Sequence, residues 1–309
     1  MSLLICFNNK DPQPWSKVLK QKLLEVDIEI YPNVKDKNKV TFALCWKACK
    51  NILEQFPNLK VIQSVGASID HITSAQTIGP DTKVSRIVDQ HLSEDMFEFV
   101  LTSILTHIKQ FPGYNQDKAH KLWQQKSYAA ISDTTIGILG AGKIGGHVAT
   151  RLALLGFKVK AWSQSEKNLK QVSSYFGQEG LSDTIRGTDI LINILPLTKE
   201  TANILNHQTL TQLNPKAFLI NVGRGEHLVE ADLIQLLDQD HLAGAHLDVF
   251  RIEPLPASHP FWQHNKILIT PHVAAITRIA SASDLVVNNY KRMLDNQELI
   301  NEVSLEKGY

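Results

Sequence analysis

The sequence contains little cysteine. Its 309 residues include three cysteines, Cys6, Cys45 and Cys49, and none of them forms a C-x-x-C pair. An odd number does not suit a disulfide framework. Cys45 and Cys49 have the i, i+4 spacing of a helix face, but no histidine or acidic residue stands beside them in the sequence. We therefore expect structural cysteines and no bound metal.

Net charge and long apolar runs are lacking as well. Lys and Arg total 32 against 31 Asp and Glu, which leaves a formal net charge of +1 and no global field for nucleic acid or anionic lipid. No apolar run approaches the roughly 18 residues of a membrane helix. The start of the chain, residues 1–7, has no basic leader. These absences predict a cytoplasmic protein with no membrane or nucleic-acid partner.

Short apolar runs alternate with helical patterns along the whole chain, which is typical of α/β proteins with parallel sheets. A first series of runs is followed by a helical pattern over 92–108, and a second series of six suits a dinucleotide-binding sheet. The polar segment 113–118 is interpreted as a crossing between domains, and a last helix is expected over 280–294. The predicted strands are 3–7, 42–46, 61–64 and 84–88, then 135–139, 157–162, 190–195, 218–222, 243–249 and 267–270.

A glycine loop opens the second series. Its sequence, Gly140-Ala141-Gly142-Lys143-Ile144-Gly145, directly follows a predicted strand and precedes a helical pattern. In that context Gly140 permits a tight turn, Gly142 lets the backbone approach a pyrophosphate, and Gly145 lets helix and strand pack closely. The helix N-terminus presents free N–H groups to the phosphates. The loop predicts a bound dinucleotide.

The end of the next predicted strand bears on the choice between NADP and NAD. NAD enzymes usually place an acidic residue there to bind the ribose hydroxyls, and this chain has Ser163 instead. Gln164 follows, and Ser165 and Lys167 could donate hydrogen bonds to a 2′-phosphate. Glu166 could instead bind the ribose of NAD. NADP is the preferred cofactor, and NAD stays open.

Three polar residues just past predicted strands are the candidate catalytic groups: Arg224, Glu253 and His272. Reduction of a 2-oxo acid needs a cation for the carboxylate, and the planar fork of an arginine suits it. A histidine, with an unperturbed pKa near 6.5, can give a proton to the carbonyl oxygen. The glutamate would orient the imidazole and favour its charged form. These contexts predict a dehydrogenase acting on a small 2-oxo acid.

The same residues stand in motifs that resemble the D-isomer-specific 2-hydroxyacid dehydrogenases. The resemblance spans nearly the whole chain. Two further sequence motifs resemble the glyoxylate/hydroxypyruvate reductase A branch: 271–278 and Lys307-Gly308-Tyr309. Ser68 and Ile69 replace a more usual glycine and valine, and Gln164 stands where the branch tends to carry arginine. The motifs that carry the family resemblance are 64–71, 195–201, 221–225, 247–256 and 270–272.

The resemblance implies an α/β fold of two Rossmann-like doubly wound domains. A flavodoxin-like split substrate domain would comprise 1–95 and 279–309, and a dinucleotide-binding domain 96–278. It also implies a homodimer. The N–H groups around Val65 and Gly66 would bind the substrate carboxylate along with Arg224. Asp248 would hold the nicotinamide carboxamide, and Trp46 would line the substrate pocket, although plain core packing is an equal alternative for Trp46.

The predicted activity is reduction of glyoxylate and hydroxypyruvate to glycolate and D-glycerate. Two alternatives are a dehydrogenase for another 2-oxo acid, of phenylpyruvate or branched-chain type, and a nucleotide-sensing binding module like the C-terminal-binding-protein corepressors. The full set of candidate cofactor residues is Gly140, Gly142, Lys143, Ile144, Gly145, Ser163, Gln164, Ser165, Lys167, Leu195, Pro196, Val222 and Asp248. The candidate substrate residues are Trp46, Val65, Gly66 and Ala67.

Overall fold

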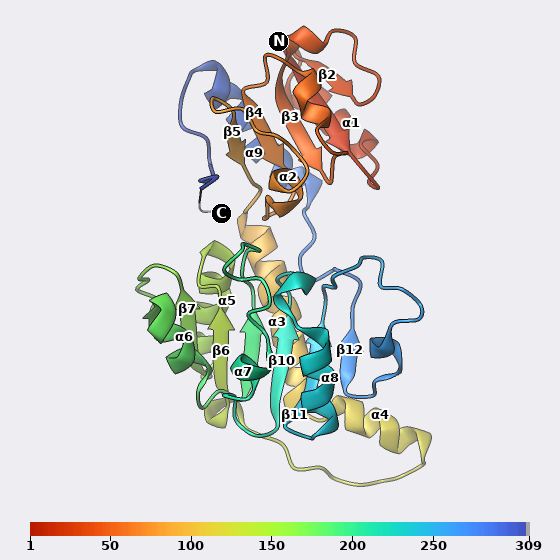
Figure 1. The fold of residues 1–309 in the computed structure, drawn as a ribbon, viewed down its shortest axis with the longest axis vertical. Helices are drawn as coiled ribbons and strands as arrows, with labels where there is room; N and C mark the ends of the chain where they lie inside the picture. The colour runs from red at the N-terminus through yellow and green to blue at the C-terminus, as the bar shows by residue number, and fades with distance from the viewer. Residues whose placement is uncertain (307–309) are drawn as a thin grey trace. The chain divides into compact units, whose positions relative to one another are not determined.

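The computed structural model describes residues 1–306, which form two compact units (Figure 1). Unit 1 comprises Met1–Leu92 together with the C-terminal segment from Thr277, and unit 2 comprises Ser93–Ile276. The signature Lys307-Gly308-Tyr309 lies outside the described residues.

Unit 1 is built on a parallel five-stranded sheet of order β2-β1-β3-β4-β5. This is the flavodoxin-like order of doubly wound sheets, in which the connection reverses direction beside the first strand. The expected fold of this part is confirmed. Its strands are β1 (Ser2–Phe7), β2 (Asp27–Ile30), β3 (Val40–Trp46), β4 (Val61–Ser64) and β5 (Lys83–Ser85).

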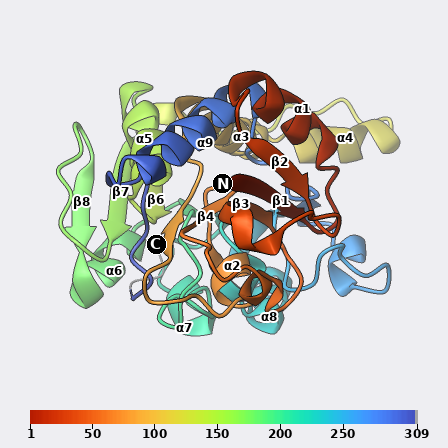
Figure 2. The same ribbon diagram turned by 90° about the horizontal axis from the view of Figure 1, so that it is seen from above.

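Alternate residues of the central strands face opposite layers, because side chains along a strand alternate between its two faces. Leu3 and Ile5 of β1 pack beneath α1 (Gln13–Lys22) and α9 (Ile279–Leu294). Leu4 and Cys6 face the layer that contains α2 (Asp70–Thr73). Figure 2 shows α1 and α9 side by side over one face of the sheet. The C-terminal helix thus completes the core of the N-terminal unit.

Unit 2 contains a parallel seven-stranded sheet of order β12-β11-β10-β9-β6-β7-β8. From the central pair β6 and β9, the sheet continues through β7 and β8 on one side and through β10, β11 and β12 on the other. This change of direction in the strand order is typical of a dinucleotide-binding sheet. The strands are β6 (Thr135–Leu139), β7 (Lys158–Ser163), β8 (Ser173–Phe176), β9 (Ile190–Asn193), β10 (Ala217–Asn221), β11 (Leu242–Leu247) and β12 (Ile267–Ile269). The helices are α3 (Gln90–Ile108), which begins in unit 1, α4 (Phe111–Ala119), α5 (Lys143–Leu154), α6 (Gly177–Ile185), α7 (His207–Leu210) and α8 (Glu230–Asp238).

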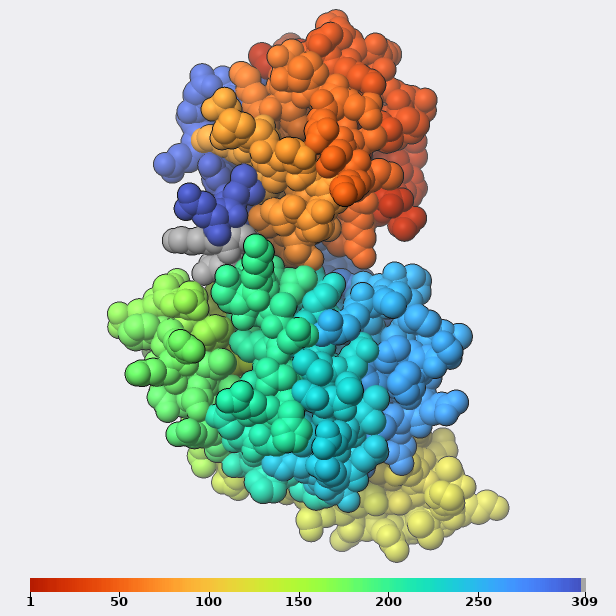
Figure 3. All heavy atoms as spheres, viewed as in Figure 1, coloured from red at the N-terminus to blue at the C-terminus, as the bar shows by residue number. Residues whose placement is uncertain are grey.

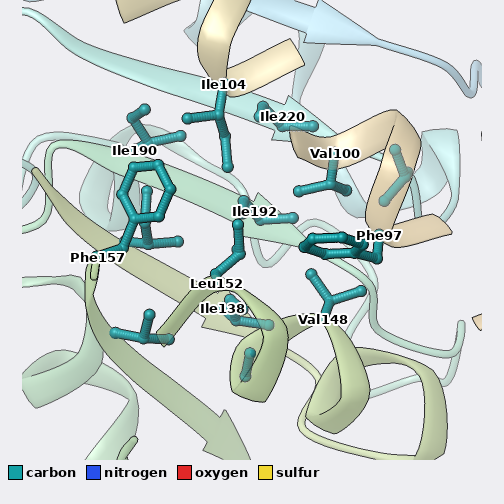
Figure 4. Packing of buried hydrophobic residues seen from close by; sticks show 14 of the residues in the cluster. Phe97, Val100, Ile104, Ile138, Val148, Leu152, Phe157, Ile190, Ile192 and Ile220 are labelled. Atoms are coloured by element: carbon teal, nitrogen blue, oxygen red, sulfur yellow. The ribbon is translucent and has the colours of Figure 1, made fainter. Parts of the chain in front are cut away.

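Apolar layers on both faces hold this sheet. On one face, Phe97, Val100 and Ile104 of α3 meet Val148 and Leu152 of α5 over the central strands (Figure 4). A second buried cluster on the other face joins the sheet to α6, α7 and α8. Each fully buried aliphatic side chain contributes about 1.5–3 kcal/mol relative to exposure. The sheet is therefore a rigid platform for the loops at its edge.

The sequence interpretation was wrong about segment 113–118. These residues belong to α4 within unit 2, and the boundary between the units falls earlier, at Leu92 and Ser93. Helix α4 has no buried residue, so its sequence carries no apolar stripe to reveal it. Strands β2 and β8 were not predicted. The predicted strand over 84–88 ends at Ser85.

Across residues 1–306, no helix is long and apolar enough to cross a membrane. In the same range no group of three or more histidine, cysteine or acidic side chains could hold a metal ion. Cys6 and Cys45 are buried free thiols, and Cys49 is exposed. Burial raises the pKa of Cys6 to about 12, so this thiol stays protonated at neutral pH.

Candidate active site

Most of the candidate residues of unit 2 follow the carboxyl ends of its strands. Because neighbouring strands are parallel, these ends share one edge of the sheet. The glycine loop follows β6, Ser163 ends β7, and Leu195 and Pro196 follow β9. The arginine loop follows β10. Asp248 and Glu253 follow β11, and His272 follows β12. The sheet therefore gathers the predicted nucleotide and catalytic residues of this unit at one edge.

The three glycines of the loop differ in what an added Cβ would meet. Gly140 has φ +110°, and a Cβ there would lie 2.8 Å from the Ile194 carbonyl oxygen. A Cβ at Gly145 would lie 2.0 Å from the Gly140 oxygen, so helix α5 and the turn touch through backbone. A Cβ at Gly142 would meet nothing within 4 Å. The open side of Gly142, at the α5 N-terminus, leaves room for a pyrophosphate.

Ser163 ends β7 in a buried position, and its hydroxyl donates a hydrogen bond to the Ser165 carbonyl oxygen (2.8 Å). The hydroxyl hydrogen is therefore bonded within the turn that follows the strand. Gln164, Ser165 and Lys167 are exposed just beyond the strand, and so is Glu166. No carboxylate stands at the strand end itself, which removes the usual partner of an unphosphorylated ribose.

The loop that carries Arg224 is held from beneath by a buried histidine. His227 is fully buried, and its Nδ1 accepts hydrogen bonds from the Arg224 N–H (3.0 Å) and from Asn193 Nδ2 (2.8 Å). Its Nε2 therefore carries the proton and points to the Pro196 oxygen at 3.2 Å. The half-buried arginine donates from Nη1 to the Gly223 oxygen (2.7 Å).

Gly225 joins the Arg224 loop to the Glu253 loop. A Cβ at this glycine would lie 1.9 Å from the Phe250 carbonyl carbon and 2.2 Å from the Arg251 nitrogen. The two loops thus meet backbone to backbone, which only glycine permits. The Phe250 N–H also donates to Glu253 Oε1 (3.2 Å). This contact fixes the glutamate relative to the arginine loop.

His272 and Glu253 form a direct pair. The imidazole Nδ1 lies 2.9 Å from Glu253 Oε2 and 3.1 Å from Oε1. A carboxylate only accepts hydrogen bonds, so Nδ1 is the donor and the ring orientation is set. The histidine side chain is 36% exposed, against 23% for the glutamate, so the imidazole reaches solvent. The pair has the geometry of an oriented acid–base histidine.

Asp248 is almost fully buried at 1% exposure. Its Oδ1 accepts from Thr270 Oγ1 (2.6 Å) and from the Val273 N–H (2.9 Å), and its Oδ2 accepts from the Ala274 N–H (2.9 Å). The carboxylate is thus bonded to the loop that carries His272. The carboxamide role expected for it is a proposal.

In unit 1, Trp46 ends β3, and residues 65–67 follow the neighbouring strand β4. A Cβ at Gly66 would lie 3.1 Å from Trp46 Cζ3, so this loop packs under the indole ring. The Val65 N–H donates to the Cys45 oxygen (3.1 Å), and the Gly66 N–H to Ser64 Oγ (3.2 Å). Arg86 donates to the Ala67 oxygen (3.2 Å).

His227 and His246 bond to the candidate site, and the sequence did not reveal them. Each histidine stands next to at least one apolar residue, where a histidine satisfied in the core is the ordinary interpretation. The closeness of His227 to the glycine–arginine motif, and of His246 to the aspartate two residues on, is the only signal that could have marked them.

Fold and site together define a dinucleotide-binding α/β protein with an arginine and a glutamate–histidine pair at the nucleotide edge. The comparisons agree. The family described as "D-isomer specific 2-hydroxyacid dehydrogenase, NAD binding domain" matches residues 101–274. Glyoxylate/hydroxypyruvate reductase A of Yersinia enterocolitica is 39% identical over 279 residues, 89% of each chain. The protein of that name from Escherichia fergusonii is 34% identical, with 100% of each chain covered.

Solved structures of D-isomer specific 2-hydroxyacid dehydrogenases and related reductases match this chain over its full length. A D-isomer specific 2-hydroxyacid dehydrogenase from Xanthobacter autotrophicus Py2, in complex with NADPH and MES, has a TM-score of 0.95 at 33% identity, covering 100% of this chain and 99% of that one. An NADPH-dependent glyoxylate/hydroxypyruvate reductase from Sinorhizobium meliloti, with NADP and sulfate, has a TM-score of 0.93 at 31% identity, covering 100% of both. The chain belongs to the D-isomer-specific 2-hydroxyacid dehydrogenase family, as its motifs predicted.

Proposed function

We propose that this enzyme reduces glyoxylate and hydroxypyruvate to glycolate and D-glycerate with NADPH. The observation that carries the proposal is the His272–Glu253 pair, 2.9 Å apart, on the strand edge that also bears the glycine loop and Arg224. The names of the curated relatives, which share 34–39% identity with this chain, support the choice of substrate.

In this proposal each catalytic side chain has one task. Arg224 binds the planar substrate carboxylate with its guanidinium fork. His272, with Nδ1 bonded to Glu253, gives the proton on Nε2 to the carbonyl oxygen as the carbonyl carbon accepts the hydride. The glutamate accepts from Nδ1 and so fixes the orientation of the imidazole that gives the proton. The products are the 2-hydroxy acid and the oxidised nucleotide.

The residues at the strand edge fit a dinucleotide, as the open space at Gly142 and the N-terminus of α5 indicate. When bound, the nicotinamide supplies the hydride. We assign the pyrophosphate to the glycine loop with Lys143 and Ile144, and the 2′-phosphate to Gln164, Ser165 and Lys167. The solved structures of two relatives contain NADPH or NADP, which supports this preference. We assign the nicotinamide end to Leu195, Pro196, Val222 and Asp248.

We also assign the loop after β4 to the substrate carboxylate. The Val65 N–H donates to the Cys45 oxygen and the Gly66 N–H donates to Ser64 Oγ, so the assignment depends on the Ala67 amide. Trp46, packed against Gly66, would set the size of side chain that a 2-oxo acid can carry.

The test is kcat/KM for NADPH and for NADH with glyoxylate, hydroxypyruvate, pyruvate and phenylpyruvate. We expect NADPH with glyoxylate or hydroxypyruvate to give the highest values. A preference for NADH would contradict the 2′-phosphate assignment and point to Glu166. A preference for phenylpyruvate would make the enzyme a dehydrogenase for another 2-oxo acid. Nucleotide binding without turnover of any of the four would favour a sensing module.

We propose that the enzyme is a homodimer formed through its segment 111–128. This segment, yellow in Figure 3, extends from unit 2. It exposes large apolar side chains: Trp123 is 100% exposed, and Phe111 and Tyr128 are each 62% exposed. Clustered aromatic exposure of this kind is typical of protein interfaces. A second copy of the chain would cover it. Light scattering should give twice the chain mass of 34.6 kDa, and Trp123→Lys should give monomers. A monomeric wild type would refute the proposal.

The three free thiols suit a reducing compartment, and we propose the cytoplasm as the location.

A further inference from the structure

His272 has a backbone conformation that is unusual for a side chain with a Cβ. Its φ is +55°, in the left-handed region, which costs free energy and persists only where the surroundings enforce it. The His272 N–H donates to the Asp248 carbonyl oxygen (2.9 Å). The next two N–H groups, of Val273 and Ala274, donate to the two carboxylate oxygens of the same residue, each at 2.9 Å. Asp248 therefore accepts from three consecutive amides of the His272 loop, the first of which also donates to the Thr270 carbonyl oxygen (3.1 Å).

Asp248 is itself the end of a buried hydrogen-bond chain. Thr270 Oγ1 lies 2.6 Å from Asp248 Oδ1 and must donate, because an ionised carboxylate only accepts. Having used its hydrogen, the same hydroxyl accepts from His246 Nε2 at 3.1 Å. Nδ1 of this imidazole is then the acceptor, and Ser103 Oγ donates to it at 2.8 Å.

This series of hydrogen bonds joins three separate elements. Ser103 lies on helix α3, His246 on strand β11, and Thr270 just after the neighbouring strand β12. His246 lies on β11 and Asp248 just past its end, and both side chains bond to the Thr270 hydroxyl. The imidazole is 5% exposed and also packs on Phe99, with ring centroids 5.0 Å apart. Burial lowers the pKa of His246 to about 4, which keeps the ring in the neutral form that the chain requires.

We propose that Ser103, His246 and Thr270 are positioning residues for the proton donor of the proposed reductase. They direct one series of hydrogen bonds onto Asp248, and Asp248 fixes the strained loop that carries His272. This inference rests on the proposed function, because it assigns His272 the proton transfer.

Thr270→Val is the first test, because valine keeps the shape of threonine and removes only the hydroxyl. His246→Leu removes the hydrogen bonds to Ser103 and Thr270. His246→Gln keeps both bonds, since an amide can donate to Thr270 and accept from Ser103. His107→Phe is the matched control. His107 lies on the same helix α3 as Ser103 and stacks on Phe218 at 4.0 Å, and burial lowers its pKa to about 4 as well.

Two measurements are needed on each variant. The first is kcat with the KM for glyoxylate, and the second is hydrogen exchange of the amides of residues 272–274. Thr270→Val and His246→Leu should lower kcat about tenfold or more while KM changes less than threefold, since a misplaced catalytic group costs rate rather than binding. Exchange at 272–274 should speed up in the same two variants. His246→Gln and His107→Phe should stay near wild type in both measurements.

The outcomes separate this inference from the proposed function. Unchanged kcat and unchanged exchange in Thr270→Val and His246→Leu would overturn the positioning role. Loss of kcat with unchanged exchange would also overturn it, because the loop would then be fixed without the chain. If the wild type reduces none of the oxo acids, the proposed function fails. The exchange data then still decide whether these residues hold the loop.

Discussion

At the scale of single residues, His272 and its carboxylate partner make the sharpest prediction. His272→Ala removes the proton donor and should lower kcat at least about a hundredfold, since general acid catalysis contributes roughly 10²–10⁴. His264→Ala is the control. It removes another histidine that lies near a carboxylate, Asp238 at 3.3 Å, outside the site. Turnover of His272→Ala within twofold of wild type would exclude the assigned role.

Glu253→Gln should lower kcat about tenfold or more, because glutamine keeps the shape of the side chain but can turn its amide N–H towards His272 Nδ1 and so no longer fixes the imidazole. The measurement is kcat and KM for glyoxylate reduction. A kcat within twofold of the wild type would make Glu253 a structural residue.

Arg224→Lys should raise the KM for glyoxylate about tenfold or more, because a point charge lacks the second parallel hydrogen bond and 1.4 kcal/mol is a factor of ten. Arg186→Lys, at the exposed end of α6, is the matched control. Affinity for NADPH should be unchanged in both variants. An unchanged KM and kcat for Arg224→Lys would remove the arginine from substrate binding.

The placement of the three catalytic candidates at one edge of the sheet could be predicted, because each follows a predicted strand in a distinctive motif. The residues that bond to their loops could not be predicted. His227 bonds the Arg224 amide from within the same turn, and His246 bonds Thr270, which follows the neighbouring strand β12. The sequence does not show which way the His227 ring turns, and it does not show the second contact because that contact joins residues from different elements.

At the scale of elements, two glycines of the loop between β6 and α5 should affect stability and nucleotide binding differently. Gly145→Ala would place a Cβ 2.0 Å from the Gly140 oxygen and should lower the melting temperature as well as NADPH affinity. Gly142→Ala meets nothing within 4 Å, so it should leave the melting temperature unchanged and weaken NADPH binding alone. The measurements are thermal unfolding and fluorescence titration. Normal NADPH affinity in Gly142→Ala would place the pyrophosphate elsewhere.

Elements with strong periodic patterns were predicted, and weakly patterned ones were not. Helix α3 and the central strands carry regular apolar positions, which burial on one or two faces requires. Strands β2 and β8 lie at sheet edges and contain few buried residues, so their sequences lack that signal. Helix α4 buries none of its residues and was interpreted as a crossing segment for the same reason.

At the scale of the whole molecule, two histidines predict acid sensitivity. Burial lowers the pKa of His107 and of His246 to about 4, from 6.5. The unfolded chain therefore binds these protons first as pH falls, so stability is full above about pH 6.5 and is lost towards pH 4. An upper bound on the loss is about 3 kcal/mol for each histidine.

Urea unfolding at pH 7, 6 and 5 measures this dependence. The unfolding free energy should fall steadily across the series. The double variant His107→Phe, His246→Gln should show a smaller fall, because it removes both groups that take up protons. A wild-type unfolding free energy that does not change between pH 7 and pH 5 would contradict the prediction.

The left-handed backbone at His272 sets two kinds of selection against each other. Glycine and asparagine adopt φ +55° at lower cost than histidine, whereas the chemistry proposed here requires an imidazole. A library randomised at position 272 and selected for heat resistance alone should collect glycine and asparagine. The same library selected for growth that depends on the reductase should return histidine, at the expense of thermal tolerance.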